Sequence, residues 1–127
     1  MSENSKKAMQ LRRSVVGDEF VDRWLGELDD VTEPLDALIT DYAWGAVWSR
    51  PGLGLRERSL ITIAVLAAGK HSNELKVHLR GAINNGCSRL EITEALLQVA
   101  PYAGIPAARD ALLIAKEFFK DLPQDTA

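Results

Sequence analysis

The sequence predicts an all-α protein. No stretch alternates apolar and polar residues as a half-buried strand would, and helix-capping signals recur at helical spacing. Hydrophobic residues make up 46% of the chain and charged residues 26%, which is ordinary for a globular protein. We expect one domain over residues 1–127, a bundle of about six to seven helices with frayed ends at about 1–8 and 122–127.

Glycine, aspartate and proline mark the first three helices. A first helix is predicted from Lys6 to Val16, because Gly17 is a natural residue just past a helix end. Asp18 is predicted to cap a short second helix. Residues 32–34 open a third helix, since their proline is tolerated in a first turn.

The third predicted helix is apolar on two faces. Trp44 and Trp48 lie one turn apart on one of them. A larger apolar set recurs at i, i+3, i+4 and i+7 on the other face and is predicted to be the core stripe. Its members are Leu35, Leu38, Ile39, Tyr42, Ala43, Ala46 and Val47. Such a helix either meets a second partner or lines a pocket.

A loop is predicted over residues 50–54 from its proline and two glycines. The fourth helix, from Leu55 to Gly69, carries no charge after Ser59 and is predicted to be the central buried helix. Its apolar run is too short to span a bilayer. The glycines of the loop do not continue into a phosphate-binding motif.

The second half of the chain has the clearest helix boundaries. Ser72 is predicted to cap a fifth helix that ends at residues 84–86. Ser88 and Glu91 form a capping box that opens a sixth helix. Pro101 is predicted to bend or end this helix, and residues 104–106 then start the last one.

Composition restricts the possible partners. Fifteen Lys and Arg against eighteen Asp and Glu give a net charge of −3, so nucleic acid is not expected as a partner. A membrane is not expected as a partner either. One cysteine, Cys87, excludes an internal disulfide and every Cys-x-x-Cys motif. The polar first ten residues do not resemble a signal peptide, so we expect a cytoplasmic location.

Glu74 and His78 are the main candidates for chemistry. They lie four residues apart on the fifth helix, so their side chains share one face. They form either a surface pair or a half-buried acid/base pair in which the carboxylate raises the imidazole pKa or fixes its tautomer. His71 would be the third ligand of a metal site, but its place near the helix start favours a structural role, and we expect no metal.

Arginines are the candidates for anion binding. Arg50, Arg56, Arg58 and Arg80 cluster in sequence around the loop and the central helices. Because arginine holds carboxylates bidentately, a small anionic molecule is a reasonable ligand. The alternative is ordinary surface pairing with the acidic residues.

Several segments resemble the carboxymuconolactone decarboxylase family. They are Asp41-Tyr42-Ala43-Trp44-Gly45, Trp48-Ser49-Arg50-Pro51-Gly52-Leu53, the segments over residues 58–64, 73–80 and 84–86, and Tyr102-Ala103-Gly104-Ile105-Pro106-Ala107-Ala108. The resemblance runs from about Met9 to Lys116. It implies an alkylhydroperoxidase-D-like helical fold, a ring-shaped homo-oligomer, most often a hexamer, and a decarboxylase of protocatechuate catabolism that uses no cofactor.

The resemblance also implies site residues. The substrate would be γ-carboxymuconolactone, a lactone dicarboxylate, with His78 as the acid and Glu74 keeping it protonated or aligned. Arg50, Arg58 and Arg80 would anchor the carboxylates, and Tyr42, Trp44 and Trp48 would wall the pocket. The family's peroxidase relatives carry Cys-x-x-Cys where this chain has His71 and Glu74, so thiol peroxidase activity is not expected. The remaining alternatives are a non-catalytic or differently specific member that binds a small anionic metabolite, and a hydrolase of the product enol-lactone.

Overall fold

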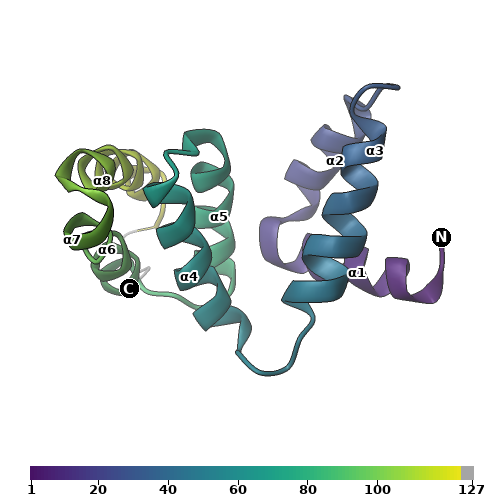
Figure 1. Cartoon of the computed structure of the whole chain (residues 1–127), viewed down its shortest axis with the longest axis horizontal. Helices are drawn as coiled ribbons and strands as arrows, with labels where there is room; N and C mark the ends of the chain where they lie inside the picture. The colour runs from purple at the N-terminus through teal and green to yellow at the C-terminus, as the bar shows by residue number, and fades with distance from the viewer. Residues whose placement is uncertain (124–127) are drawn as a thin grey trace. The chain divides into compact units, whose positions relative to one another are not determined.

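The computed structural model describes residues 1–123, and every regular element in them is a helix (Figure 1). The all-α prediction is therefore confirmed for this part of the chain. The contacts divide the chain into two compact units, residues 1–54 and residues 55–127, here called unit 1 and unit 2. That both belong to one domain stays a prediction.

Unit 1 contains α1 (Glu3–Val16), α2 (Asp18–Gly26), α3 (Glu33–Leu38) and the π-helix η1 (Ile39–Trp48). Helix α1 packs against η1, where a Cβ placed on Gly45 would lie 3.4 Å from the Cβ of Ala8. A larger residue than glycine at this position would press directly on α1. The absence of a side chain here lets the two helices approach closely.

The first helix begins earlier than the sequence predicted. The Ser2 hydroxyl accepts a hydrogen bond from the backbone N–H of Ser5, and α1 starts at Glu3. The prediction of a frayed segment over residues 1–8 is therefore wrong, because a serine cap satisfies an N–H group of the first turn. At the other end Leu122 is buried, so fraying does not begin there, and residues 124–127 lie outside the described part.

The face of residues 33–48 that was predicted to be the core is largely exposed. Leu35, Leu38 and Tyr42 are half to two-thirds exposed, whereas Thr40, Trp44 and Trp48 are buried. The reason is the π-helix, in which the N–H of Ser49 donates to the carbonyl of Trp44, five residues earlier. In this wider turn residues seven apart no longer share a face as they do in an α-helix, so the predicted stripe breaks up over η1, whereas residues four apart still lie together.

Unit 2 contains α4 (Leu55–Ala68), α5 (Ser72–Asn84), α6 (Arg89–Leu97), α7 (Ala100–Ala103) and α8 (Ile105–Lys120). Helix α4 packs against α5 and α6, and α8 covers α5, α6 and α7. The core is a continuous apolar cluster that includes Ile63, Leu75, Leu79, Ile92 and Leu96. Several alanines of α8 complete it, which lets this helix lie close to its neighbours.

Most helix boundaries of unit 2 follow the sequence. The capping box is present, with the Ser88 hydroxyl accepting from the N–H of Glu91 and the Glu91 carboxylate accepting from the N–H of Ser88. Helix α6 ends at Leu97 and Pro101 lies in the first turn of α7. Gly104, at φ +101°, then separates α7 from α8 in a conformation that favours glycine.

Three sequence expectations about helices need correction. Helix α4 is buried along Ser59, Ile63 and Ala67 only, and Val65 on its opposite side is 62% exposed, so it is not buried all round. Asp18 and Ser72 are the first residues of their helices and not the caps, which are Gly17 and His71. In both cases the helix begins at the residue that was predicted to be its cap, so the cap lies one residue earlier in the chain.

Candidate functional site

The pair formed by Glu74 and His78 is the centre of the candidate site in unit 2. The side of α5 that packs into the core carries Leu75, Leu79 and Ala82. Glu74 and His78 lie on the adjacent side of this helix. His78 is buried, and its Nε2 lies 3.9 Å from Oε2 of Glu74, whose side chain is exposed. The spacing prediction is correct, since both side chains lie on one face of α5. The separation is too long for a hydrogen bond.

Burial decides the charge of His78. Loss of hydration disfavours the imidazolium and lowers the pKa of His78 from 6.5 to about 4. In the chain by itself His78 is therefore neutral at pH 7. The expectation that Glu74 raises this pKa is wrong, because desolvation outweighs a carboxylate that lies 3.9 Å away and is itself exposed to water.

His71 lies at the start of α5, as its sequence position suggested. It occupies the N-cap position and is exposed. A Cβ added to Gly69 would lie only 2.7 Å from Cδ2 of His71, so the imidazole ring rests directly over this glycine. Across residues 1–123, no three His, Cys, Asp or Glu side chains gather closely enough to hold a metal ion. The contacts of His71 are those of a residue that shapes the turn between α4 and α5.

The two arginines of unit 2 that were predicted to anchor substrate, Arg58 and Arg80, lie in different places. The Arg80 guanidinium carbon is 5.1 Å from the ring centroid of Phe118 on α8. Two residues along a helix correspond to a rotation of about 200°, so Arg80 points away from the side of His78. Arg58 is half-buried near the start of α4. Of these two, Arg80 is the one held against α8.

Asn85, to which the sequence analysis gave no role in the site, is bonded to the part of α4 that carries Arg58. Its side-chain amide donates to the Ser59 hydroxyl at 2.9 Å and to the carbonyl of Leu55 at 3.3 Å. These bonds tie the start of α4 to the end of α5. Arg58 therefore lies level with the C-terminal end of α5, whereas Glu74 lies in its first turn.

The remaining candidates belong to unit 1. Trp44 and Trp48 stack on η1 with their ring centroids 4.6 Å apart, and both are buried. Tyr42 is exposed on another side of η1, and Arg50 follows η1 in the loop to unit 2. The two tryptophans form a buried stacked pair, whereas Tyr42 does not join them.

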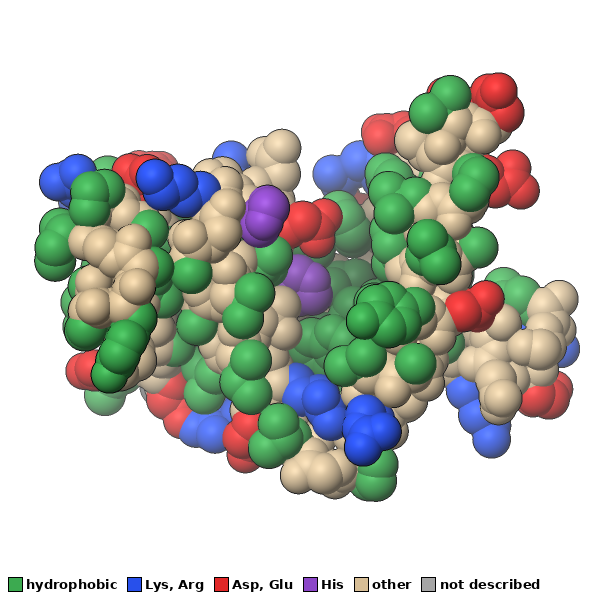
Figure 2. Space-filling view, viewed as in Figure 1, with side chains coloured by type: hydrophobic (Ala, Val, Ile, Leu, Met, Phe, Trp, Pro, Cys, Tyr) green, Lys and Arg blue, Asp and Glu red, His purple; other side chains and the backbone are tan. Residues whose placement is uncertain are grey.

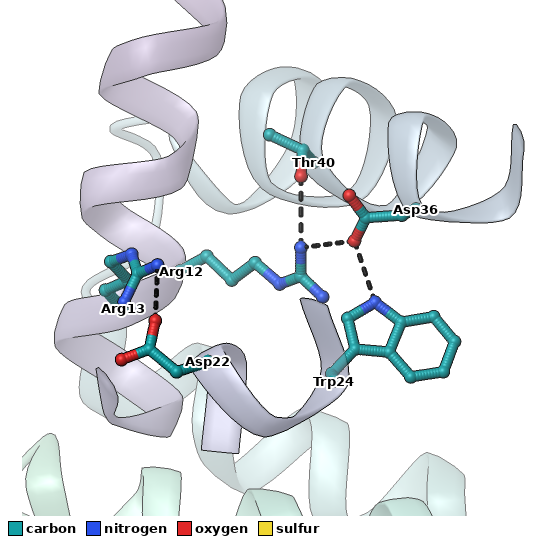
Figure 3. Close-up of polar contacts among 6 residues, drawn as sticks. All are labelled: Arg12, Arg13, Asp22, Trp24, Asp36 and Thr40. Atoms are coloured by element: carbon teal, nitrogen blue, oxygen red, sulfur yellow. Dashed lines mark hydrogen bonds and ion pairs between the residues drawn. The ribbon is translucent and has the colours of Figure 1, made fainter. Parts of the chain in front are cut away.

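Sequence reasoning also missed a buried polar cluster in unit 1 (Figure 3). The Arg12 guanidinium donates to Oδ1 of Asp36 at 2.8 Å and to the hydroxyl of Thr40 at 3.1 Å. The indole N–H of Trp24 donates to the same Asp36 oxygen at 2.8 Å. A possible signal was the i, i+4 spacing of Asp36 and Thr40, two polar residues that share one helix face. The cluster links α1, α2, α3 and η1.

The cysteine of unit 2 does not favour thiol chemistry. Cys87 is buried, its Sγ lies 3.5 Å from the carbonyl of Arg56, and burial raises the pKa of its thiol. A raised pKa reduces the thiolate that reaction with a peroxide requires. Helix α5 instead offers a neutral buried imidazole beside an exposed carboxylate.

Comparison with known proteins identifies the family. Residues 33–117 match the Carboxymuconolactone decarboxylase family. The chain is 44% identical over 117 residues to the 4-carboxymuconolactone decarboxylase of Acinetobacter baylyi, covering 92% of this chain and 87% of that protein. It is 40% identical over 116 residues to the nitrosuccinic acid decarboxylase of Metarhizium robertsii, covering 91% of this chain and 81% of that protein. The chain therefore belongs to the carboxymuconolactone decarboxylase family, as its sequence motifs predicted.

Proposed function

We propose that this protein decarboxylates γ-carboxymuconolactone to β-ketoadipate enol-lactone and CO₂ in the catabolism of protocatechuate. The observation that carries the proposal is the 44% identity to a 4-carboxymuconolactone decarboxylase over nearly the full length of both chains. The imidazole–carboxylate pair on α5 supports it with groups suited to moving a proton.

The substrate supplies its own electron sink. The carboxylate that leaves is attached to the ring carbon that also bears the lactone oxygen and an acetate arm. When its C–C bond breaks, the electron pair passes through the ring double bond into the lactone carbonyl and forms a dienolate. Protonation at the carbon next to that carbonyl gives the enol-lactone, so the net reaction consumes one proton and releases CO₂. The mechanism requires no cofactor.

His78 is the proposed proton donor. The substrate is a dianion, and negative charge beside a buried imidazole favours its protonated form. Binding would therefore place a proton on His78 although its pKa in the free protein is about 4. After transfer to the dienolate the imidazole returns to its neutral state. Glu74, whose carboxylate lies 3.9 Å from Nε2, would orient the ring and help to stabilise the imidazolium.

The other proposed roles concern substrate binding. Arg50, Arg58 and Arg80 are proposed anchors for the two carboxylates. Arg58 is favoured, since Arg80 is held over Phe118. Trp44 and Trp48 offer the aromatic surface proposed as the pocket wall, together with Tyr42. An apolar wall would favour the loss of charge as CO₂ departs.

Product analysis tests this proposal. Purified protein is mixed with freshly generated lactone in D₂O, and the product is followed by ultraviolet absorbance and NMR. We expect CO₂ release and one deuterium at the carbon next to the lactone carbonyl. Binding of the lactone without turnover would instead indicate a non-catalytic member. Opening of the enol-lactone when it is supplied alone would indicate a hydrolase.

A second candidate substrate follows from the other relative. Nitrosuccinic acid, named in the decarboxylase that is 40% identical, is also a dicarboxylate, and its nitro group can accept the electron pair that CO₂ leaves behind. The two reactions would make the same three demands on the enzyme. It must bind two carboxylates, stabilise a delocalised carbanion and supply one proton. Comparing kcat/KM for the two substrates decides between them, and we expect the lactone to be preferred.

The proposed state of the protein is a cytoplasmic homo-oligomer, with a hexamer favoured. Exposed apolar residues on both units, such as Leu38 and Leu113, support assembly. No helix among residues 1–123 is long and apolar enough to cross a membrane. Neither nucleic acid nor a membrane is proposed as a partner.

A further inference from the structure

Arg58 lies on the side of α4 that is turned away from α6. Arg56, two residues earlier, forms an ion pair with Glu91 on α6. Because two residues along a helix correspond to a rotation of about 200°, the Arg58 side chain leaves α4 on the opposite side. The Thr62 hydroxyl donates to the carbonyl of Arg58 at 2.7 Å, and both residues are half-buried. Arg58 and Thr62 therefore form a strip of α4 that faces away from α6.

His78 lies on the corresponding side of α5. Arg80, two residues later, is held over Phe118 of α8, so His78 is directed away from α8. Helix α6 packs against α4, α8 packs against α5, and α6 and α8 pack against each other. The sides that carry Arg58 and His78 therefore belong to one face of the α4–α5 pair, here called the Arg58–His78 face. Figure 2 shows both histidines (purple) along α5 and basic side chains (blue) near the start of α4.

Asn85 joins the two helices at this face. It lies seven residues after His78, and residues seven apart on an α-helix share one side, about 10 Å apart along the axis. Its amide donates to the hydroxyl of Ser59, which is fully buried, and to the carbonyl of Leu55. Because Leu55 and Ser59 stand on either side of Arg58 in the chain, these bonds fix the level of Arg58 along α5 relative to His78.

The chemistry of the lactone determines which of its carboxylates suits an arginine. The carboxylate that leaves becomes neutral CO₂, so an arginine bound to it would stabilise the charge that the reaction must remove. The carboxylate of the acetate arm keeps its charge throughout, and an arginine can hold it bidentately at every stage. The arm and the carbon that takes up the proton are at different ring positions. One substrate molecule can therefore contact an arginine at one end and the imidazole at the other.

We propose that Arg58 binds the acetate-arm carboxylate and that Asn85 is a positioning residue, which holds Arg58 at the separation from His78 that this substrate requires. The inference rests on the proposed decarboxylation of the lactone. Since the arm does not react, its contact with Arg58 is the same in the ground state and in the transition state. Loss of that contact weakens binding and leaves the chemical step unchanged, so Asn85 affects KM and not kcat.

Steady-state kinetics on the lactone tests the role of Asn85. Asn85→Leu keeps the size of the side chain and removes both donors, so KM should rise about five- to tenfold with kcat within about twofold. Ser59→Ala keeps the bond to Leu55 and should raise KM about two- to threefold. This second variant carries the test if circular dichroism shows that Asn85→Leu does not fold. Asn73→Leu, at an exposed asparagine of α5, is the matched control and should behave like the wild type.

Two further measurements separate positioning from a merely structural role. With the methyl ester of the acetate arm as substrate, the wild type and Asn85→Leu should have the same KM. Arg58→Gln should raise KM for the lactone at least as much as Asn85→Leu, and the double variant should not exceed Arg58→Gln alone. A general loss of structure would instead raise KM for both substrates and add to the effect of Arg58→Gln.

The outcomes distinguish this proposal from the proposed function. A wild type that releases no CO₂ from the lactone would overturn both. If the wild type is active, three results overturn the positioning role of Asn85 alone. They are an unchanged KM in Asn85→Leu, an equal rise of KM for the ester, and an effect that adds fully to that of Arg58→Gln.

Discussion

Each unit buries one strongly polar side chain, and the two are held in different ways. In unit 1 the Arg12 guanidinium is surrounded by Asp36 and Thr40 at hydrogen-bond distance. In unit 2 the His78 imidazole is buried with the carboxylate of Glu74 3.9 Å from its Nε2, and the pKa falls to about 4. The first arrangement stabilises a permanent charge, and the second suppresses one.

This difference follows from the cores around them. Unit 2 has a continuous apolar cluster that provides its stability, so it can hold a desolvated, neutral imidazole. Unit 1 is a short segment whose buried residues include Arg12 and Thr40 beside Val15, Val21 and two tryptophans. A segment of this size buries too little apolar surface to be stable without further support. We infer that the Arg12 cluster serves the fold and that His78 serves the chemistry.

The largest expected effect concerns the chemistry. His78→Gln keeps volume and hydrogen bonding but cannot supply a proton, so kcat should fall about 10²- to 10⁴-fold with folding intact. Glu74→Gln should cost less, and the double variant should be far from additive. His71→Gln is the matched control and should have a mild effect, since His71 lies at the N-cap of α5.

Steady-state kinetics on the lactone checks this prediction. A His78→Gln enzyme that keeps kcat within about threefold of the parent, together with loss of activity in a Tyr42 or His71 variant, would assign the proton to another group.

The next largest effect concerns the fold of unit 1. Arg12→Met leaves the Asp36 carboxylate buried with only part of its partners, so the free energy of unfolding should fall by about 3–5 kcal/mol. The neighbouring Arg13 pairs with Asp18 and Asp22 at the surface (Figure 3 shows Asp22), so Arg13→Met should cost much less stability than Arg12→Met. Urea denaturation followed by tryptophan fluorescence measures both. Equal losses for the two variants would contradict the structural role of Arg12.

A smaller effect is expected from acid. The pKa of His78 is 6.5 in the unfolded chain and about 4 in the folded one, so between these values only the unfolded chain binds the proton. Stability should therefore fall as the pH drops from 6.5 to 4, by up to about 3 kcal/mol from this group, and not further below pH 4.

Comparison with His78→Gln isolates this contribution, because the carboxylates titrate in both proteins. The difference in unfolding free energy between wild type and variant should shrink as the pH is lowered. A constant difference would mean that His78 has an ordinary pKa in the folded chain.

The smallest effect concerns two serines at the helix ends of unit 2. Ser88→Ala removes a hydroxyl that accepts from the N–H of Glu91 and should destabilise by about 1 kcal/mol. Ser72→Ala should be nearly neutral, because Ser72 is the first residue of α5 and makes no cap bond. Thermal unfolding of the two variants separates them, and the opposite ranking would place the cap at Ser72.

The helices and the family could be predicted from the amino-acid sequence alone. Helix boundaries depend on residues that affect only the backbone next to them. Examples are Gly17, Pro101, Gly104 and the capping box at Ser88. The i, i+4 spacing of Glu74 and His78 likewise needs only a helix to bring the side chains onto one face. The motifs over residues 41–53 and 102–108 led to the family before any fold was known.

Which helix faces are buried and what charge His78 carries depend on contacts between segments far apart in the chain. The buried face of residues 39–48 is not the one predicted, and the π-helical turn that breaks the i, i+7 stripe cannot be deduced from a hydrophobic pattern that fits an α-helix almost as well. The burial of Arg12 depends on Asp36 and Thr40, more than twenty residues away. The pKa of His78 depends on how much water the folded chain removes from the ring, a property of packing that no spacing of residues along the sequence contains.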